Sequence, residues 1–335
     1  MEFCAASRPP PLGDRIAMNI GKVRLTVPVT LAPMEEHTNF PFRLLMKRFG
    51  ASLVCTERID AATVVRRDRR ALRMLYTTAA ERPRAAQISG AEPGVMAAAA
   101  RVIEQQGFDL VDLNFECPIR RILARGEGGA LMGDPAAVER IVAAVTRAVS
   151  MAVTVKLRTG PDAEHETAVE VARRAQDAGS AAIGVHARSV AQSYVGRPDW
   201  EVVARVKQAV HVPVLGSGGI REAADVPRRL RESAADAVSI GRGCLGNPWI
   251  FRQTVALLTG NSVSRAPTRA ERGRVLLQLV EGEFRYYGPA VAIRRLARTS
   301  CYFAKGLPDF GEFRGAVQCV RDLTSFRRLA AEYFR

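Results

Sequence analysis

Short apolar segments alternate with amphipathic stretches along most of this chain, from about residue 29 to residue 241. Short runs rich in β-branched residues are typical of buried strands, and the longer stretches between them carry a helical period. Eight strands alternating with helices predict an α/β fold, a parallel TIM (β/α)8 barrel. The strands are predicted at 29–34, 51–57, 84–89, 109–114, 152–157, 181–186, 212–217 and 236–241, and the helices at 41–49, 93–106, from about 134, 163–178, 200–210 and 221–232.

An open, doubly wound sheet is the alternative fold for such a regular alternation. A dinucleotide-binding sheet of that kind carries a Gly-x-Gly-x-x-Gly turn after an early strand. No such turn follows the early strands of this sequence, and the barrel is therefore favoured.

The pattern changes beyond about residue 259. A polar linker with one proline runs from Asn261 to Thr268, and the remaining sequence has only helical periodicity, at 271–287, 291–303 and 311–333. We therefore expect three parts: an N-terminal extension (1–25), a barrel (26–258) and a small C-terminal helical domain (259–335), for which the charge described next suggests RNA binding.

The charge of the chain indicates a polyanionic partner. The formal net charge is +15, and arginine supplies almost all of it. Basic clusters lie at 66–70 and 120–125, and residues 285–335 hold nine Arg and one Lys against four acidic residues. Such an excess is the usual electrostatic footprint of nucleic-acid binding. The alternative explanations are an arginine-rich codon usage and solvated helical faces.

Other features of the composition exclude several classes of protein. No apolar run approaches the roughly 18–20 residues of a membrane span, and residues 1–15 have no apolar core of a secretion signal. The six cysteines are scattered without a Cys-x-x-Cys pair, which argues against a zinc site and a disulfide framework. We expect a cytoplasmic, monomeric protein without a metal.

The candidate chemistry begins at Cys117. The strand 109–114 ends in Asn114, and Cys117 and Pro118 follow, with a basic, glycine-rich stretch after them. A proline ends strand pairing, so the thiol should lie just outside the sheet, at the end of a parallel barrel where active sites form. The alternative is a buried, inert cysteine.

Two glycine turns at the ends of the last strands predict a phosphate site. These are Gly216-Ser217-Gly218-Gly219 and Gly241-Arg242-Gly243. Glycines allow backbone N–H groups to approach a phosphate closely, and the loops after strands seven and eight are where barrels bind it. Arg242 adds positive charge at the same place.

Three polar side chains at other strand ends suit a flavin mononucleotide held by that phosphate. Lys156 can hold the negative charge of a reduced flavin ring, and Gln87 can hydrogen-bond to the ring edge. His186 lies at the end of the sixth strand. The alternatives are a Schiff-base lysine, as in an aldolase, and a histidine that only packs in the core.

These motifs together resemble the FMN-dependent tRNA-dihydrouridine synthases, from about residue 31 to residue 335. The resemblance is carried by Ala32-Pro33-Met34-Glu35, Asn114-Phe115-Glu116-Cys117-Pro118, Lys156-Leu157-Arg158-Thr159-Gly160 and His186-Ala187-Arg188 with Tyr194. The long run from Ile240 to Phe251 and Lys305-Gly306-Leu307-Pro308 extend it.

The resemblance implies that NADPH or NADH reduces FMN and that the flavin reduces a tRNA uridine. Cys117 is then the catalytic acid that protonates C5 of the uridine, which must be turned out of the RNA fold. The expected FMN-binding residues are Pro33, Met34, Glu35, Gln87, Lys156, His186, Ser217, Gly218, Gly219, Gly241 and Arg242. The expected tRNA-binding residues are Asn114, Arg158, Arg188, Arg120, Arg121, Arg294, Arg295 and Arg298.

The chain departs from the family pattern at positions near the expected flavin. Glu116 stands where the family usually has glycine, and a carboxylate there should raise the pKa of the thiol and repel phosphate. Ser217 and Gly219 replace an amide and a carboxylate, and Asn39 stands where an aspartate is common. Two other functions therefore stay open: a different flavin barrel, such as a dihydroorotate-type dehydrogenase, and an RNA-binding relative that has lost its flavin.

Overall fold

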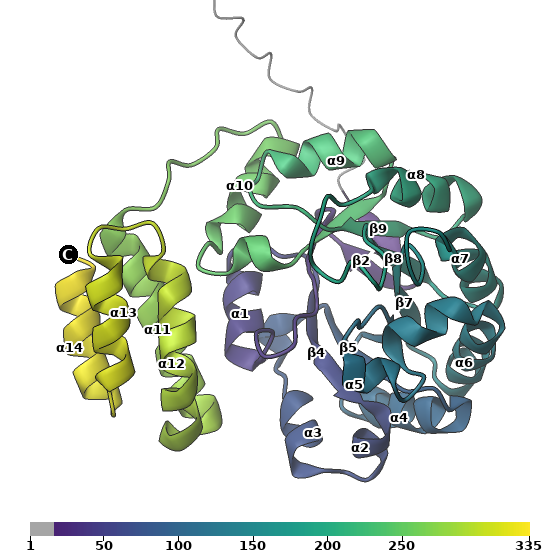
Figure 1. Ribbon diagram of the computed structural model, residues 1–335, viewed down its shortest axis with the longest axis horizontal. Helices are drawn as coiled ribbons and strands as arrows, with labels where there is room; N and C mark the ends of the chain where they lie inside the picture. The colour runs from purple at the N-terminus through teal and green to yellow at the C-terminus, as the bar shows by residue number, and fades with distance from the viewer. Residues whose placement is uncertain (1–16) are drawn as a thin grey trace, which may run out of the picture.

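The computed structural model describes residues 17–335 and contains a parallel barrel (Figure 1). Its sheet has the order β3-β10-β9-β8-β7-β6-β5-β4, and all neighbouring pairs are parallel. Thr30 bridges Leu53, and the Leu31 N–H donates to the Leu53 carbonyl at 2.9 Å, which closes the ring between β3 and β4. The predicted barrel is thus confirmed. The strands are β3 (Val29–Leu31), β4 (Val54–Asp60), β5 (Arg84–Ser89), β6 (Leu110–Phe115), β7 (Ala152–Arg158), β8 (Ala182–His186), β9 (Val214–Ser217) and β10 (Ala237–Ile240).

A β-hairpin covers the amino-terminal end of the barrel. Strands β1 (Met18–Ile20) and β2 (Val23–Leu25) pair antiparallel, and their buried Ile20 and Leu25 join a separate apolar cluster with residues at the starts of the barrel strands. The described part of the expected N-terminal extension therefore forms the floor of the barrel. The rest of that extension, 1–16, lies outside the described residues.

The helices surround the sheet, and the main core lies between the two layers. Most helices begin within a few residues of their predicted positions, but α2, α3, α5 and α10 were not predicted, and the helix expected at 163–178 begins only at Ala168. The helices are α1 (Phe40–Arg48), α2 (Ala61–Val65), α3 (Arg69–Met74), α4 (Pro93–Gln105), α5 (Arg120–Leu123), α6 (Pro135–Ala148), α7 (Ala168–Asp177), α8 (Trp200–Ala209), α9 (Asp225–Ser233), α10 (Trp249–Leu258), α11 (Arg269–Tyr287), α12 (Pro289–Ala304), α13 (Phe310–Cys319) and α14 (Leu323–Tyr333).

The last predicted helix, 311–333, is wrong as a single element, because the chain folds there into α13 and α14. Val320 has extended backbone angles, which end α13. Asp322 then caps α14 by accepting from the Ser325 N–H at 2.8 Å. An N-cap aspartate within an apolar helical period is the local signal that marks this break.

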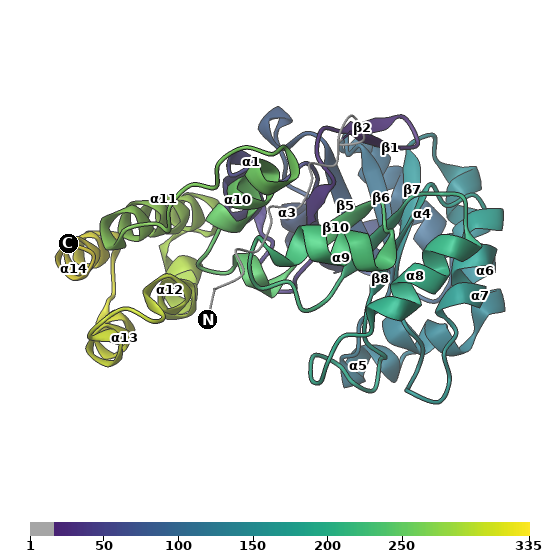
Figure 2. The ribbon, with the colours of Figure 1, turned by 90° about the horizontal axis from the view of Figure 1, so that it is seen from above.

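Helices α11–α14 form a bundle beside the barrel, next to α1 and α10 (Figures 1 and 2). The contact between α11 and α1 is close: a Cβ at Gly282 would lie 3.0 Å from the Cβ of Pro41. The buried carboxylate of Glu283 accepts from the Asn39 Nδ2 of the barrel at 2.9 Å and from the Arg295 Nε of α12 at 3.2 Å. Polar contacts thus fix how the bundle sits on the barrel.

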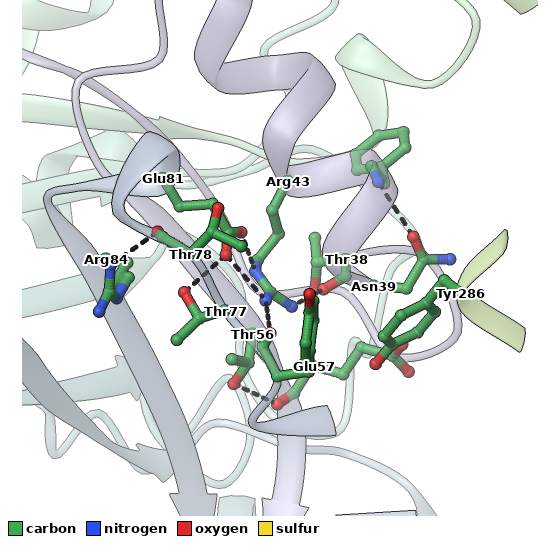
Figure 3. A network of polar contacts seen from close by, with 12 residues as sticks. Thr38, Asn39, Arg43, Thr56, Glu57, Thr77, Thr78, Glu81, Arg84 and Tyr286 are labelled. Atoms are coloured by element: carbon green, nitrogen blue, oxygen red, sulfur yellow. Dashed lines mark hydrogen bonds and ion pairs between the residues drawn. The ribbon is translucent and has the colours of Figure 1, made fainter. Parts of the chain in front are cut away.

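A second buried network holds the loop between β3 and α1 (Figure 3). The Arg43 guanidinium donates to the Glu81 carboxylate at 2.8 Å, to the Thr38 carbonyl at 3.0 Å and to the Tyr76 carbonyl at 2.8 Å. Both charged side chains are almost completely buried. A buried pair of this kind fixes geometry, because loss of either partner leaves an uncompensated charge. The network therefore anchors one wall of the cavity described next.

Candidate functional site

A cavity of about 1250 Å³ opens at the carboxyl ends of the barrel strands. The parallel topology brings the ends of all eight strands to this mouth, and that is why residues far apart in the sequence meet there. Most of the predicted site residues line it: Pro33, Met34, Glu35, Gln87, Asn114, Cys117, Arg121, Lys156, His186, Arg188, Ser217, Gly218, Gly219, Gly241 and Arg242.

The Cys117 loop is held in place by its backbone. The Asn114 Oδ1 accepts from the Cys117 N–H at 3.0 Å, and the Cys117 carbonyl accepts from the Gly129 N–H at 3.0 Å. Gly128 and Gly129 have no room for a side chain, since a Cβ on either would come within about 3 Å of Cys117 or its neighbours. Burial raises the pKa of the Cys117 thiol, and the thiol therefore stays protonated at neutral pH.

Gln87 and Asn114 belong to a chain of buried hydrogen bonds. The Asn114 Nδ2 donates to the Gln87 Oε1 at 2.9 Å, and the Gln87 Nε2 donates to the Asp112 carboxylate at 2.7 Å. Burial raises the pKa of Asp112, whose other oxygen accepts from Thr154 at 2.6 Å. Sequence reasoning missed Asp112, although a carboxylate within the apolar strand 109–114 was a visible signal. This chain links β5, β6 and β7 to the Cys117 loop.

Lys156 has a carboxylate partner inside the cavity. Its Nζ lies 2.7 Å from the Glu116 Oε2 and 3.0 Å from the Ser217 Oγ. Gly184, opposite Lys156 on β8, leaves the space that the lysine needs, because a Cβ there would lie 2.7 Å from the Lys156 Cδ. Glu116 and Ser217, two of the four positions at which the sequence departs from the family pattern, thus meet at one ammonium group.

The end of the cavity near β9 and β10 carries the two glycine turns. Gly218 and Gly219 have φ angles of 115° and 72°, which favour glycine. The Gly218 carbonyl accepts from the Trp200 indole N–H at 3.0 Å, and the turn is thereby tied to α8. The short helix of Arg242–Cys244 begins directly after β10. The Arg242 guanidinium lies over the Tyr194 ring, 5.2 Å from its centroid.

Two buried polar groups at this end have no partner among the described residues. They are the Nη1 of Arg188 and the Nδ1 of His186. The other nitrogens of Arg188 donate to the carbonyls of Val195 and Gly196. Burial, with Lys156 and the nearby arginines, lowers the pKa of His186 well below its usual value, so the imidazole is neutral. Unpaired buried groups of this kind are costly unless a ligand satisfies them.

The other predicted RNA-binding residues lie in three different environments. Arg120 and Arg294 are exposed. Arg158 does not line the cavity: it is buried and donates to the carbonyls of Glu116 at 2.9 Å and Ser189 at 2.9 Å, and it holds the loop that carries Tyr194. Arg295 and Arg298 contact Glu36 of the barrel, so they hold the helical bundle in place.

A further cationic group, which sequence reasoning missed, lies near Cys117. Arg58 lies in the second half of β4, lines the cavity and donates to the Ser89 Oγ at 2.8 Å, while its buried Nε has no partner among the described residues. Its guanidinium lies 3.6 Å from the Glu35 carboxylate, which also accepts from Arg121 at 2.8 Å. Nothing in the apolar pattern of residues 54–60 marked this arginine as a cavity residue.

The described residues show neither a group of three or more side chains suited to a metal ion nor a helix with the length and apolar character to cross a bilayer.

Comparison with known proteins identifies the family. The model of the dihydrouridine synthase family matches residues 30–333. A probable tRNA-dihydrouridine synthase of Rickettsia conorii is 34% identical over 318 residues, which cover 95% of this chain and 96% of that protein. The tRNA-dihydrouridine synthase B of Xanthomonas axonopodis pv. citri is 36% identical over 317 residues, with 95% and 96% covered.

Solved structures of similar fold are more distant in sequence. An old yellow enzyme homologue from Zymomonas mobilis is 14% identical, with a TM-score of 0.52 over 76% of this chain and 94% of that one. Morphinone reductase in complex with tetrahydroNAD is 15% identical, with a TM-score of 0.54 over 77% of this chain and 93% of that one. At this identity the likeness supports the barrel fold alone.

Proposed function

We propose that this chain, which belongs to the dihydrouridine synthase family, reduces the C5–C6 bond of a uridine in tRNA. FMN is the proposed bound cofactor, and NADPH or NADH is the proposed electron donor. The observation that carries this proposal is the meeting of a buried, protonated thiol, a lysine and a phosphate cradle in one cavity.

The donor groups of the cavity fit FMN. The glycine turns at 218–219 and 241, together with Arg188 and Arg242, suit its phosphate, and the Arg188 Nη1 still lacks an acceptor within the described chain. An ammonium group has three N–H donors, and the two contacts of Lys156 leave one for the flavin ring. When bound, FMN would accept a hydride from the nicotinamide and supply a hydride to C6 of the uridine.

Cys117 supplies the proton that this reduction needs at C5. Its pKa, raised by burial, keeps the thiol in the acid form, and the hydrogen bonds of Asn114 and Gly129 fix its backbone. A thiol held in this way is a competent general acid. After proton transfer, Arg58 lies close enough for its charge to favour the thiolate.

The tRNA must present its target base to the cavity while the protein holds the rest of the molecule by its phosphates. Two exposed arginines supply charge for such contacts: Arg120 on α5 of the barrel and Arg294 on α12 of the bundle. Arg295 and Arg298 act on RNA binding indirectly in this proposal, because they hold α12 against the barrel.

The decisive experiment compares tRNA from cells with and without this gene by mass spectrometry of nucleosides. The proposal expects dihydrouridine at one or more positions only when the gene is present. Restoration by the wild-type gene but not by the Cys117→Ala gene would link the product to this site. Identical dihydrouridine in both strains, together with purified protein that takes up no FMN, would refute the proposal.

A further inference from the structure

The Glu116 carboxylate has no part in the proposed chemistry, although it lies inside the cavity, is paired with Lys156 and belongs to the residue before Cys117. The Glu116 Oε2 lies 2.7 Å from the Lys156 Nζ, and the two side chains are 14% and 6% exposed. Both residues line the cavity. A carboxylate so placed opposes the charge that the lysine would otherwise present to a ligand.

The Glu116 side chain is not needed to shape the loop. The Glu116 N–H donates to the Asn114 Oδ1 at 3.3 Å, and the Glu116 carbonyl accepts from the Arg158 Nε at 2.9 Å. These two contacts fix the backbone before Cys117 without any contribution from the carboxylate. Within residues 17–335, the one hydrogen-bond or ion-pair partner of that carboxylate is Lys156.

The Glu116 carboxylate lies next to a cluster of basic side chains. Burial depresses the pKa of the His186 imidazole, and the nearby charges of Lys156, Arg158, Arg188 and Arg242 lower it further. Glu116 is the acidic group that contacts this cationic cluster directly, through Lys156. The Glu116 carboxylate therefore repels a bound anion, whereas the basic side chains around it attract one. This repulsion is strongest at Lys156, because the Glu116–Lys156 pair is shielded from water.

We propose that Glu116 is a built-in counter-ion of Lys156 that lowers the reduction potential of the bound flavin. Reduction adds negative charge to the flavin ring, and an unpaired lysine stabilises that charge. A carboxylate 2.7 Å from the ammonium group cancels part of the stabilisation. The flavin of this chain thereby becomes harder to reduce with the nicotinamide and a stronger reductant toward uridine. This inference rests on the proposed function, because it requires bound FMN.

The test measures the midpoint potential of FMN bound to the purified wild-type protein and to Glu116→Gln and Glu116→Gly variants. Both variants should shift the equilibrium toward reduced flavin about tenfold, which is about 30 mV for a two-electron couple. Sulfite, which adds to oxidised flavin and gives it negative charge, provides a second readout. Its dissociation constant should fall about tenfold in both variants.

Glu127→Gln is the matched control. Glu127 lies in the same loop region, is also 14% exposed and pairs with Arg125 at 2.7 Å, but it does not line the cavity. It loses the same charge at the same burial, so the potential of its flavin should equal that of the wild type.

The outcomes separate this inference from the proposed function. A wild-type protein that takes up no FMN would refute the proposed function itself. Wild-type potential and sulfite affinity in FMN-loaded Glu116→Gln would overturn the role of Glu116 alone. An equal shift in Glu127→Gln would also overturn it, because the effect would then reflect net charge and not the contact with Lys156.

Discussion

Replacement of Glu283 by alanine should loosen the helical bundle from the barrel. The Glu283 carboxylate is 3% exposed and accepts from Asn39 at 2.9 Å, from Arg295 at 3.2 Å and from Thr299 at 3.3 Å. Asn39 belongs to the barrel, and the other two donors belong to α12. The variant thus removes a polar link between the two parts and leaves the Arg295 charge without its carboxylate.

The magnitude follows from the burial of this pair. Removal of one partner of a buried ion pair costs about 3–5 kcal/mol. The Arg295 side chain is 15% exposed and keeps its contact with the Glu36 carbonyl, which places the loss near the lower limit. A loss of about 3 kcal/mol is roughly a 100-fold change in the equilibrium by which α12 opens from its packed position against α11 and the barrel.

Amide hydrogen exchange measures this equilibrium directly. The slowest-exchanging amides of α12 should exchange roughly 100-fold faster in Glu283→Ala if their exchange requires the bundle to open. Uptake of FMN should stay normal, because Glu283 does not line the cavity, whereas tRNA affinity should fall.

Glu281→Ala is the matched control for this prediction. Glu281 lies on the same helix and pairs with Arg327, whose side chain is 51% exposed, within the bundle. Exposed pairs contribute about 0–1 kcal/mol, so α12 exchange should change by no more than about fivefold. Equal exchange rates in the two variants would refute the docking role of Glu283.

Four further predictions concern the cavity and the RNA surface. Lys156→Ala should fold normally, as judged by circular dichroism, but purify largely without flavin absorbance. Cys117→Ala should accept electrons from NADPH at the wild-type rate and lose about 10²–10⁴-fold in transfer to tRNA, measured by stopped-flow absorbance. Because burial raises the thiol pKa, the wild-type transfer rate should not fall with rising pH until above the usual cysteine pKa of about 8.5; a fall centred below pH 8 would contradict this reasoning. Arg120→Glu and Arg294→Glu should each weaken tRNA binding and reduce its salt slope by about one, and affinity unchanged at two salt concentrations would remove these arginines from the binding surface.

The sequence by itself determined the barrel and most of the predicted side chains that line its cavity. The spacing of apolar residues that predicts a strand or a helix can be seen within a short segment of sequence. A regular alternation of the two is compatible with few folds. Parallel strands end on one side, so the sequence alone places Cys117, Lys156 and His186 at one mouth, and all three line the cavity there. The break at Val320 and the cap at Asp322 were also local signals, but the helical period on both sides concealed them.

Only the tertiary structure decided which partner each charged side chain has. Glu116 pairs with Lys156 because the register of β6 and β7 places Asn114 opposite Lys156, and Glu116 follows Asn114 by two residues. Arg158 became buried, and Arg295 became a docking residue, through contacts with loops distant in sequence. The physical reason is that no periodic pattern in the sequence identifies the partner of a charged side chain. The role of such a side chain depends on the nearest opposite charge and on burial, and both arise only when distant segments pack together.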